Sequence, residues 1–325
     1  MPSLSGIPAT LAAVVCLLAS TSPSAAQDWP TRPIRILVGF GPGGGTDVVT
    51  RIIAEPLSEV LGQRIVVENK PGAGGTLAGD MIAKGPKEGY DALMISTGHT
   101  VSAVMIKAQA YDAVKDFTPV GIVANSAFVV VVPKDFSAHD LKGLIEVAKR
   151  EPGKLNYATV GIGSTQHLTA ELLRQRAGIS AQHVSFRTTP EVVTALLRKD
   201  VSYAIDLAHA VRGQVQSGDL RILAVATAKR WPSLPDVPTM MEAGIPDFEV
   251  LGWYGLVFPA GVPAAIVAKM RAGLAQVLSR ESVRSQLEKV GALANLSTAE
   301  EFGSLIESEV AKWRDVARKA GLEPK

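Results

Sequence analysis

Two short glycine-rich segments carry the residue types needed to hold a small anion. The first, residues 39–46, directly follows an apolar run and precedes a helical pattern that begins near Asp47. The second, residues 161–167, also follows a strand-like run, and it carries Ser164 and Thr165. Free amides at a helix N-terminus attract negative charge, and glycines let a ligand approach the backbone. Both segments therefore indicate anion-binding chemistry.

Three kinds of ligand compete for the first segment. The spacing from Gly39 to Thr46 matches a P-loop, but Gly45 stands where the phosphate-binding lysine must be, so a nucleoside triphosphate is excluded. Residues 39–44 also fit the dinucleotide pattern G-x-G-x-x-G, and Glu68 lies about where a ribose-binding acid belongs. The third interpretation is a cradle for a carboxylate, and a purely structural tight turn is the alternative to all three.

The rest of the sequence offers no catalytic or metal-binding constellation. Ser164 lies in a G-x-G-S-T context and not in the nucleophile elbow G-x-S-x-G. The single cysteine, Cys16, belongs to the N-terminal segment, and no cluster of His, Asp or Glu has metal-ligand spacing. Two helix starts bearing hydroxyl groups suit binding better than catalysis. We therefore expect a protein without enzymatic activity, cofactor or metal.

Strand-like and helix-like patterns alternate along the chain and position both glycine segments. This order predicts parallel sheets with helices on their faces, and ligands in such sheets bind at the carboxyl ends of the strands. Two long apolar strands, 120–132 and 249–258, are expected to connect two lobes, with a cleft between them. The predicted units are lobe 1 (27–131 and 251–325), lobe 2 (132–250) and a helical tail (262–319), broken at Gly291 and Ser297, that packs on lobe 1.

The N-terminal segment is typical of a signal peptide. Residues 1–26 contain no Asp, Glu, Lys or Arg, and the apolar core 11–18 is too short to span a bilayer. Cleavage is expected before Gln27, although the usual basic start is missing and a buried N-terminal helix is the alternative. The net charge of +2, with acidic and basic residues interspersed, gives no footprint for nucleic acid or an anionic membrane. We expect an exported protein that does not insert in a membrane.

Seven segments of the sequence match a known family. The chain resembles the Bug-type solute-binding proteins of tripartite tricarboxylate transporters, and the resemblance covers essentially all of the chain after the signal peptide. The segments are Trp-Pro-x-Arg-Pro-Ile-Arg at 29–35, Gly-Pro-Gly-Gly-Gly-Thr-Asp at 41–47, Val-Glu-Asn-Lys-Pro-Gly-Ala-Gly-Gly at 67–75, Lys-Asp-Phe-Thr-Pro at 115–119, Pro-Gly-Lys-Leu-Asn-Tyr at 152–157, Gly-Ser-Thr-Gln-His at 163–167 and Leu-Pro-Asp-Val-Pro-Thr at 234–239.

The resemblance implies a two-lobed periplasmic binding fold of the type II kind. It also implies a receptor that captures a small carboxylate and delivers it to integral membrane transporter subunits. In this family the first glycine loop holds a carboxylate through backbone amides and ordered waters. Carried over to this sequence, the implied cleft residues are Gly43, Gly44, Thr46 and Asp47 of that loop, Ser96, Thr97 and His99 after the third strand, and Ser164, Thr165 and His167 of the second lobe.

Five further side chains are candidates for ligand contact. Arg187, in a segment that departs from the family pattern, could clamp a second carboxylate or be a solvated surface residue. Asp206 could accept a hydrogen bond from the ligand or cap the following helix. Phe40 and Trp253, with Tyr254 beside it, could form an apolar wall or belong to the core. His99 and His167 are candidate donors to the anion.

The function expected from these observations is that of a monomeric periplasmic receptor for a small organic carboxylate. The two glycine loops would close on the anion from opposite lobes by a hinge motion. An exported dinucleotide-dependent oxidoreductase that uses residues 39–44, and a ligand-sensing subunit of a signalling system, are the alternatives. The sequence leaves open whether the ligand is a dicarboxylate, an acidic amino acid or an aromatic acid.

Overall fold

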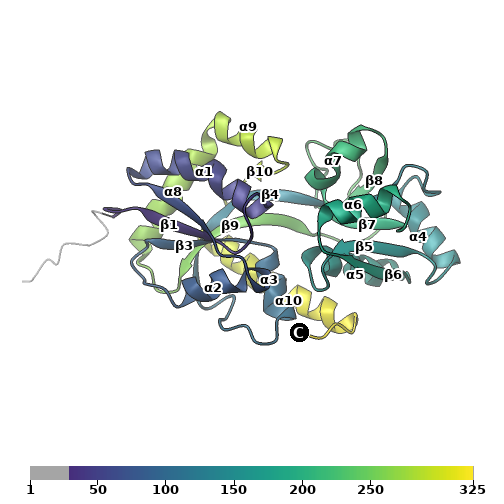
Figure 1. The fold of residues 1–325 in the computed structure, drawn as a ribbon, viewed down its shortest axis with the longest axis horizontal. Coiled ribbons are helices and arrows are strands. Elements are labelled where there is room, and N and C mark those ends of the chain that lie inside the picture. Colours follow the sequence, from purple (N-terminus) through teal and green to yellow (C-terminus); the bar gives the residue numbers. More distant parts are fainter. Residues whose placement is uncertain (1–28, 325) are drawn as a thin grey trace, which may run out of the picture.

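The protein consists of two α/β lobes connected by long strands, as the sequence predicts (Figure 1). The computed structural model describes residues 29–324, so the predicted signal peptide and Cys16 lie outside the described part of the chain. Within residues 29–324, no helix combines the length and the apolar character needed to cross a bilayer. The strand order and the arrangement of the helices confirm the predicted two-lobed α/β architecture.

The first lobe is built on three parallel strands. Its elements are β1 (Ile34–Val38), α1 (Gly45–Leu61), β2 (Ile65–Asn69), the 3-10 helix η1 (Ala73–Gly75), α2 (Thr76–Ala83), β3 (Asp91–Ser96) and α3 (Gly98–Met105). β1 pairs in parallel with both β2 and β3. Ile34, Ile36 and Val38 of β1 are fully buried, because helices cover the sheet and such strands are apolar throughout. The carboxyl ends of β1 and β3 face the second lobe.

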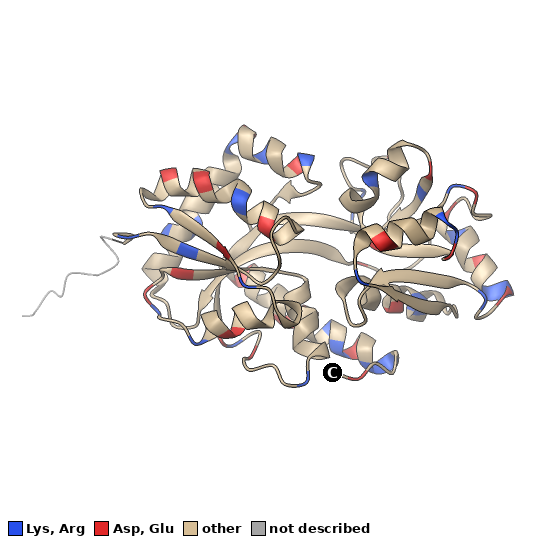
Figure 2. Cartoon of the chain, in the orientation of Figure 1, with Lys and Arg blue, Asp and Glu red and all other residues tan. Residues whose placement is uncertain are grey.

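Two long strands cross between the lobes. They are β4 (Phe117–Pro133) and β9 (Leu251–Pro259). β9 is antiparallel to β3 and to the first part of β4, whereas the second part of β4 pairs with strands of the other lobe. Neither crossing strand contains a charged residue, and both are uniformly tan in Figure 2. The sheet is consequently continuous from one lobe to the other.

The second lobe repeats the α/β plan. Its elements are α4 (Leu141–Arg150), β5 (Asn156–Val160), α5 (Thr165–Ala177), β6 (Gln182–Phe186), α6 (Thr189–Leu197), β7 (Tyr203–Leu207), α7 (Ala208–Gln216) and β8 (Leu220–Val225). β5 is parallel to β6 and β7, and β7 and β8 are each antiparallel to β4. The carboxyl end of β5 leads directly into the second glycine loop, as the carboxyl end of β1 leads into the first.

The C-terminal tail is interrupted between Gly291 and Ser297, as the sequence predicts, but it does not pack on lobe 1 alone. It comprises α8 (Ala264–Ser279), α9 (Glu281–Lys289), the short strand β10 (Leu293–Ala294) and α10 (Ala299–Lys319). β10 pairs with β4, so the helical pattern is interrupted. The first half of α10 buries Phe302 and Ile306 in the first lobe, as expected. Its second half buries Trp313 and Val316 in the core of the second lobe, so the tail does not pack on lobe 1 alone.

The helix α3 was not predicted from the sequence. Residues 96–99 were expected to form a loop at the cleft, but the chain turns into a helix at Gly98. Val101 and Met105 on this helix are buried in the same hydrophobic core as the second lobe's side chains. The helix has only 8 residues, so its packing against both lobes, and not its own propensity, stabilises it.

Trp313 provides a test of the role of α10 in joining the lobes. Its side chain is fully buried in the second lobe's core although its helix begins in the first lobe. We predict that Trp313→Ala lowers the free energy of unfolding by about 3–5 kcal/mol, because it leaves a large cavity. Urea unfolding measures the change, and the exposed neighbour Arg314→Ala is the control, expected within about 0.5 kcal/mol of the parent. Equal effects of both substitutions would contradict this role.

Candidate functional site

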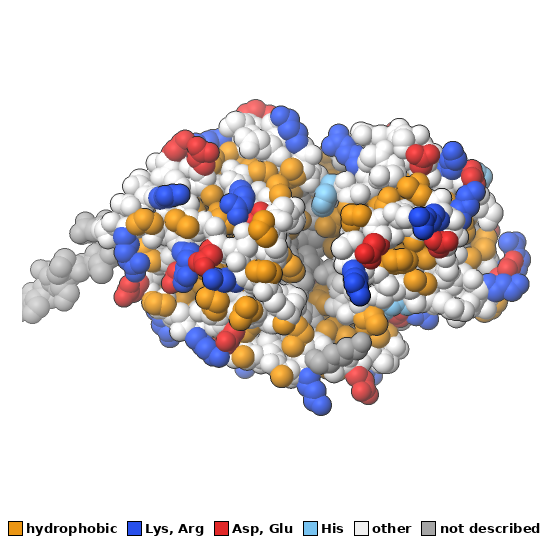
Figure 3. Space-filling model, in the orientation of Figure 1, with side chains coloured by type: hydrophobic (Ala, Val, Ile, Leu, Met, Phe, Trp, Pro, Cys, Tyr) orange, Lys and Arg blue, Asp and Glu red, His pale blue; other side chains and the backbone are white. Residues whose placement is uncertain are grey.

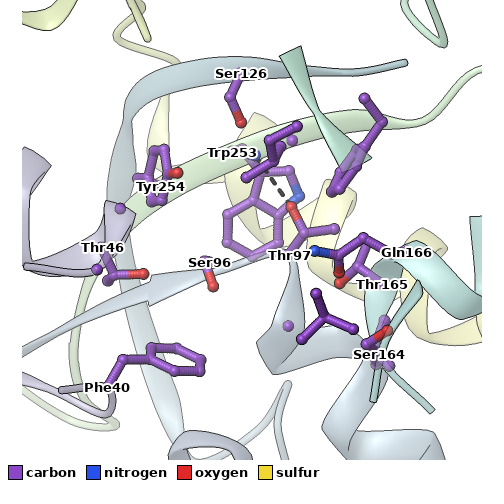
Figure 4. A pocket seen from close by; sticks show the side chains of 18 of the residues that line it. Phe40, Thr46, Ser96, Thr97, Ser126, Ser164, Thr165, Gln166, Trp253 and Tyr254 are labelled. Atoms are coloured by element: carbon purple, nitrogen blue, oxygen red, sulfur yellow. Dashed lines mark hydrogen bonds between the residues drawn. The ribbon is translucent and has the colours of Figure 1, made fainter. Parts of the chain in front are cut away.

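A cavity of about 400 Å³ lies between the lobes, at the carboxyl ends of β1, β3, β5 and β7 (Figures 3 and 4). Its size is that of a pocket for a small molecule. Figure 4 shows Phe40 and Thr46 on one side of the cavity and Ser164, Thr165 and Gln166 on the other. Eight of the predicted site residues line it: Phe40, Gly44, Thr46, Ser96, Thr97, Ser164, Thr165 and Trp253.

The N-terminus of α1 presents free amides to this cavity. Its N-cap residue is Gly44, and no described side chain caps the helix. The first intrahelical bond runs from the amide of Val48 to the carbonyl of Gly44, so the amides of Gly45, Thr46 and Asp47 have no helical acceptor. Gly45 and Thr46 line the cavity. This helix start can therefore donate hydrogen bonds to an anion.

Asp47 supports the first glycine loop and does not line the cavity. Its carboxylate accepts hydrogen bonds from the Gly43 amide (2.8 Å), the Arg51 guanidinium (2.9 Å) and the Asn69 amide (2.9 Å). Burial by itself would raise the pKa of Asp47, but these hydrogen bonds lower the pKa below its ordinary value. The Gly43 amide is occupied by this contact. Of the three consecutive glycines at 43–45, Gly44 and Gly45 line the cavity and Gly43 does not.

The second glycine loop has the same local geometry as the first. The Gly163 amide donates to Nδ1 of His167 (3.0 Å), four residues later, as the Gly43 amide donates to Asp47. Gly43 (φ +81°) and Gly163 (φ +76°) both have the left-handed backbone conformation that favours glycine. The two loops, one in each lobe, thus form a pair of helix starts with the same supporting contact and glycine conformation, although only α5 has a side-chain cap, Ser164.

His167 is a support for this loop and does not line the cavity. Its ring is buried and stacks on His183, with 3.9 Å between ring centroids. Burial lowers the pKa of His167, which keeps the ring neutral so that Nδ1 can accept the hydrogen bond from Gly163. Ser164, the N-cap residue of α5, accepts from the His167 amide (3.1 Å) and faces the cavity. The structure thus places His167 behind the loop and not at the cavity, where it was expected to donate to the anion.

Tyr254 on β9 fixes the position of the first helix start. A Cβ atom on Gly45 would lie 2.5 Å from the hydroxyl of Tyr254. Only glycine allows the helix to begin this close to the tyrosine, since real Cβ contacts are longer. Burial raises the pKa of Tyr254, so its hydroxyl stays protonated and can donate to a ligand.

Trp253, which directly precedes Tyr254 on β9, forms the central wall of the cavity. Its indole Nε1 donates to the buried carboxylate of Glu309 on α10 (3.1 Å), and Thr100 donates to the same oxygen (3.0 Å). Burial raises the pKa of Glu309. The backbone amide of Trp253 also donates to the hydroxyl of Thr97 (3.1 Å). Trp253 is 1% exposed, so it belongs to both the core and the cavity wall, the two roles that the sequence left open.

Three predicted site residues lie elsewhere. His99 is buried against Tyr111, and its Nε2 contacts the carbonyl of Ala113 at 3.0 Å. Arg187 is exposed and does not line the cavity. Asp206 is buried behind the wall of the second lobe. None of these three side chains lines the cavity, so none is placed to contact an anion there as expected.

Asp206 has a different role from the helix cap that was the alternative interpretation. The N-cap of α7 is Leu207, and Asp206 accepts hydrogen bonds from the Leu207 amide (2.8 Å) and the Thr189 hydroxyl (2.9 Å). It also lies 3.4 Å from the amide nitrogen of Gln166, which lines the cavity. Burial raises the pKa of Asp206, partly offset by these hydrogen bonds. The carboxylate therefore positions Gln166 from behind.

Several cavity residues were missed by sequence reasoning. Gln166 lies within the second glycine segment and could have been included with its neighbours. Ser126 is one of few polar residues in the apolar strand β4, and that exception was a usable signal. Phe128 and Leu207 carried no signal, because apolar residues on strands are usually core. His209, at the start of α7, also lines the cavity.

The cavity lacks charged side chains. Among residues 29–324, no Asp, Glu, Lys or Arg lines it, and no group of three or more potential metal ligands was found. Figure 2 shows charged residues of both signs distributed over the two lobes. Any attraction for an anion must come from helix N-termini, amides and hydroxyl groups.

The comparison with protein families decides the kind of protein. The model of the "Tripartite tricarboxylate transporter family receptor" matches residues 49–322. The chain belongs to this family. It is 35% identical over 304 residues to the "UPF0065 protein in tcbD-tcbE intergenic region" of Pseudomonas sp. strain P51, covering 92% of this chain and 90% of the relative. It is 31% identical over 321 residues to protein BugT of Bordetella pertussis, covering 97% and 98%.

Solved structures of similar proteins have the same fold. "R. palustris Rpa4515 with adipate" is 33% identical, with a TM-score of 0.79, and the match covers 92% of this chain and 100% of that one. "MatC (Rpa3494) from Rhodopseudomonas palustris with bound malate" is 32% identical, with a TM-score of 0.75, covering 89% and 99%. The resemblance to Bug-type receptors stated from the sequence is thereby confirmed, and two of the similar structures are described with the carboxylates adipate and malate.

The acidic residue that a dinucleotide site would need does not lie at the cavity. Glu68, expected to bind a ribose, forms ion pairs with Arg35 (3.1 Å) and Lys70 (2.7 Å) and does not line the cavity. The matching family is described as a transporter receptor. The glycine pattern at residues 39–44 is therefore explained by the helix start that it forms.

His99 gives a pH-dependent test of its structural role. Burial lowers its pKa from 6.5 to about 4, so the unfolded chain gains a proton below about pH 6.5 that the folded chain binds only near pH 4. Stability present above pH 6.5 is therefore lost as the pH falls. Compared with His99→Gln, the parent is predicted to lose up to about 1.4 kcal/mol more unfolding free energy per pH unit between pH 6 and 4.5. Parallel pH profiles in chemical denaturation would contradict this.

Proposed function

We propose that this protein is a periplasmic receptor that captures a small organic carboxylate between its lobes and delivers it to a tripartite tricarboxylate-type membrane permease. The pair of helix starts at Gly44–Thr46 and Ser164–Gln166, facing one cavity, is the observation that carries the proposal. The family match and the carboxylates bound by two relatives support it.

Binding is proposed to rely on dipoles that the fold holds in place. The free amides of Gly45 and Thr46 and the hydroxyls of Thr46 and Ser164 donate to the carboxylate oxygens. Such charge-assisted hydrogen bonds are about twice as strong as neutral ones. Because the amides belong to helices supported by Asp47 and His167, they need no rearrangement to receive the anion.

Capture is proposed to close the lobes around the ligand by a hinge motion, and the permease would recognise the closed form. A monomer suffices for this cycle, because both helix starts come from one chain. Export by the predicted signal peptide would place the receptor in the periplasm. These steps follow from the family's transport role.

A titration with matched anionic and neutral compounds tests carboxylate capture. We predict that at least one acid in a panel of hexanoate, benzoate, adipate, malate and aspartate binds saturably in isothermal titration calorimetry. The neutral amide of that acid is expected to bind at least about tenfold more weakly, because it cannot satisfy the helix N-termini with charge. Failure of every acid to bind, or equal binding of acid and amide, would refute the proposal.

Gly45 gives a test of the first helix start. A methyl group there would meet the Tyr254 hydroxyl, so Gly45→Ala is predicted to weaken binding of the acid at least about tenfold. The double variant Gly45→Ala with Tyr254→Phe removes the clashing oxygen and is expected to regain part of the affinity. Tyr254→Phe alone is the control, and thermal unfolding verifies that each variant is folded. Unchanged affinity in Gly45→Ala would exclude the helix start as the anion site.

A further inference from the structure

A second cavity adjoins the main one and contains the positive charge that the lining of the main cavity lacks. Its volume is about 270 Å³, and it shares Gly45, Ser126, His209 and Tyr254 with the main cavity. The rest of its lining comes from the first glycine loop and the first turn of α1, from α7, and from the end of α9 with the turn that leads to β10. The two cavities therefore meet at the start of α1, where the anion is proposed to bind.

Two exposed cations line this adjoining cavity, one from each lobe. Arg212 lies on α7 of the second lobe, and Lys289 is the last residue of α9 in the first lobe. Neither side chain lies within 4.0 Å of a carboxylate among residues 29–324, whereas Arg280, which precedes α9, is paired with Glu59 (2.6 Å). Because both cations are exposed, the adjoining cavity opens to solvent.

The lobes touch at this opening, which places the two cations on the same side of the cleft. Gly291, two residues after Lys289, lies so close to α7 that a Cβ atom on it would be 2.3 Å from the Cβ of His209. Arg212 follows His209 by three residues, so the two lie on one face of α7. Figure 3 shows basic side chains over α7 and α9 on the two sides of the cleft. An anion that enters here passes both positive charges.

The other titratable groups near this opening do not attract an anion. His209 borders both cavities, but burial lowers its pKa, so its ring is neutral at pH 7. Glu288, the acidic neighbour of Lys289, is exposed and lines neither cavity. Behind the walls of the main cavity lie the carboxyl groups of Glu309 and Asp206, which offer an anion no attraction. The attraction at this opening therefore comes from the two exposed cations.

We propose that Arg212 and Lys289 steer the carboxylate into the cleft and accelerate its association, while the helix starts hold it. This inference rests on the proposed function, because it assumes an anionic ligand. Exposed charges act over the Debye length, about 10 Å at 0.1 M salt and about 30 Å at 0.01 M, and charges at the rim of a site change mainly the association rate. Neither cation lines the main cavity, so the dissociation rate is expected to depend little on them.

Stopped-flow mixing measures the association rate constant through the intrinsic fluorescence to which Trp253 in the cavity wall contributes. Of the five acids in the calorimetric panel, hexanoate, benzoate and aspartate carry one net negative charge at neutral pH, and adipate and malate carry two. In about 20 mM salt, Arg212→Gln combined with Lys289→Gln is expected to slow association at least about threefold for a monoanion and about tenfold for a dianion. The interaction energy doubles with the charge of the ligand, and salt at about 0.5 M is expected to abolish the difference.

Lys149→Gln combined with Arg150→Gln is the matched control. It removes the same two charges from exposed positions at the end of α4, which lies at the end of the second lobe remote from the cleft (Figure 1). We expect its rate constants to stay within about twofold of the parent. Unchanged association in the Arg212 and Lys289 variant, an equal loss in the control, or a change in dissociation alone overturns the inference and leaves carboxylate capture intact. Failure of all five acids to bind refutes the proposed function, and this inference with it.

Discussion

The cavity depends on the start of helix α1, whose first amides have no intramolecular hydrogen-bond acceptor. An amide that is shielded from water needs a partner, and at α1 the N-cap position is filled by a glycine that has no side chain to offer one. The surrounding residues maintain this condition: Asp47 occupies the Gly43 amide and leaves the next amides free, and Tyr254 approaches Gly45 too closely for any other residue. The proposed anion site is therefore formed by backbone amides whose positions these side chains fix.

The two lobes are linked by more than the crossing strands. α10 buries Phe302 in one hydrophobic core and Trp313 in the other, and α3 contributes Met105 to the core of the second lobe. A change in the angle between the lobes must therefore also move side chains at the ends of α3 and α10. The bond between Glu309 and Trp253 connects α10 to the cavity wall, so ligand contact and lobe arrangement share one set of residues.

The sequence predicted the elements that have strong local signals. Apolar strands followed by glycine-rich helix starts placed β1, β5 and both loops correctly, because turn chemistry and periodicity are local properties. Three predictions that depended on the direction of a side chain were not met: His99 is buried, and Asp206 and His167 lie behind the walls of the cavity. Direction is set by packing between distant segments, as for Trp253 against Glu309, 56 residues away. Helix α3 was missed for the same reason.

Separating the anion contact from the cavity walls has a consequence for specificity. The amides at Gly45 and Thr46 cannot be changed by ordinary substitution, since every residue type retains its backbone N–H except proline. The wall positions, such as Val160 and Leu207, are side chains at strand ends and can change without disturbing the helix starts. If the helix start binds the carboxylate as proposed, relatives at about a third identity could share one fold and one carboxylate contact while different wall residues select different ligand bodies.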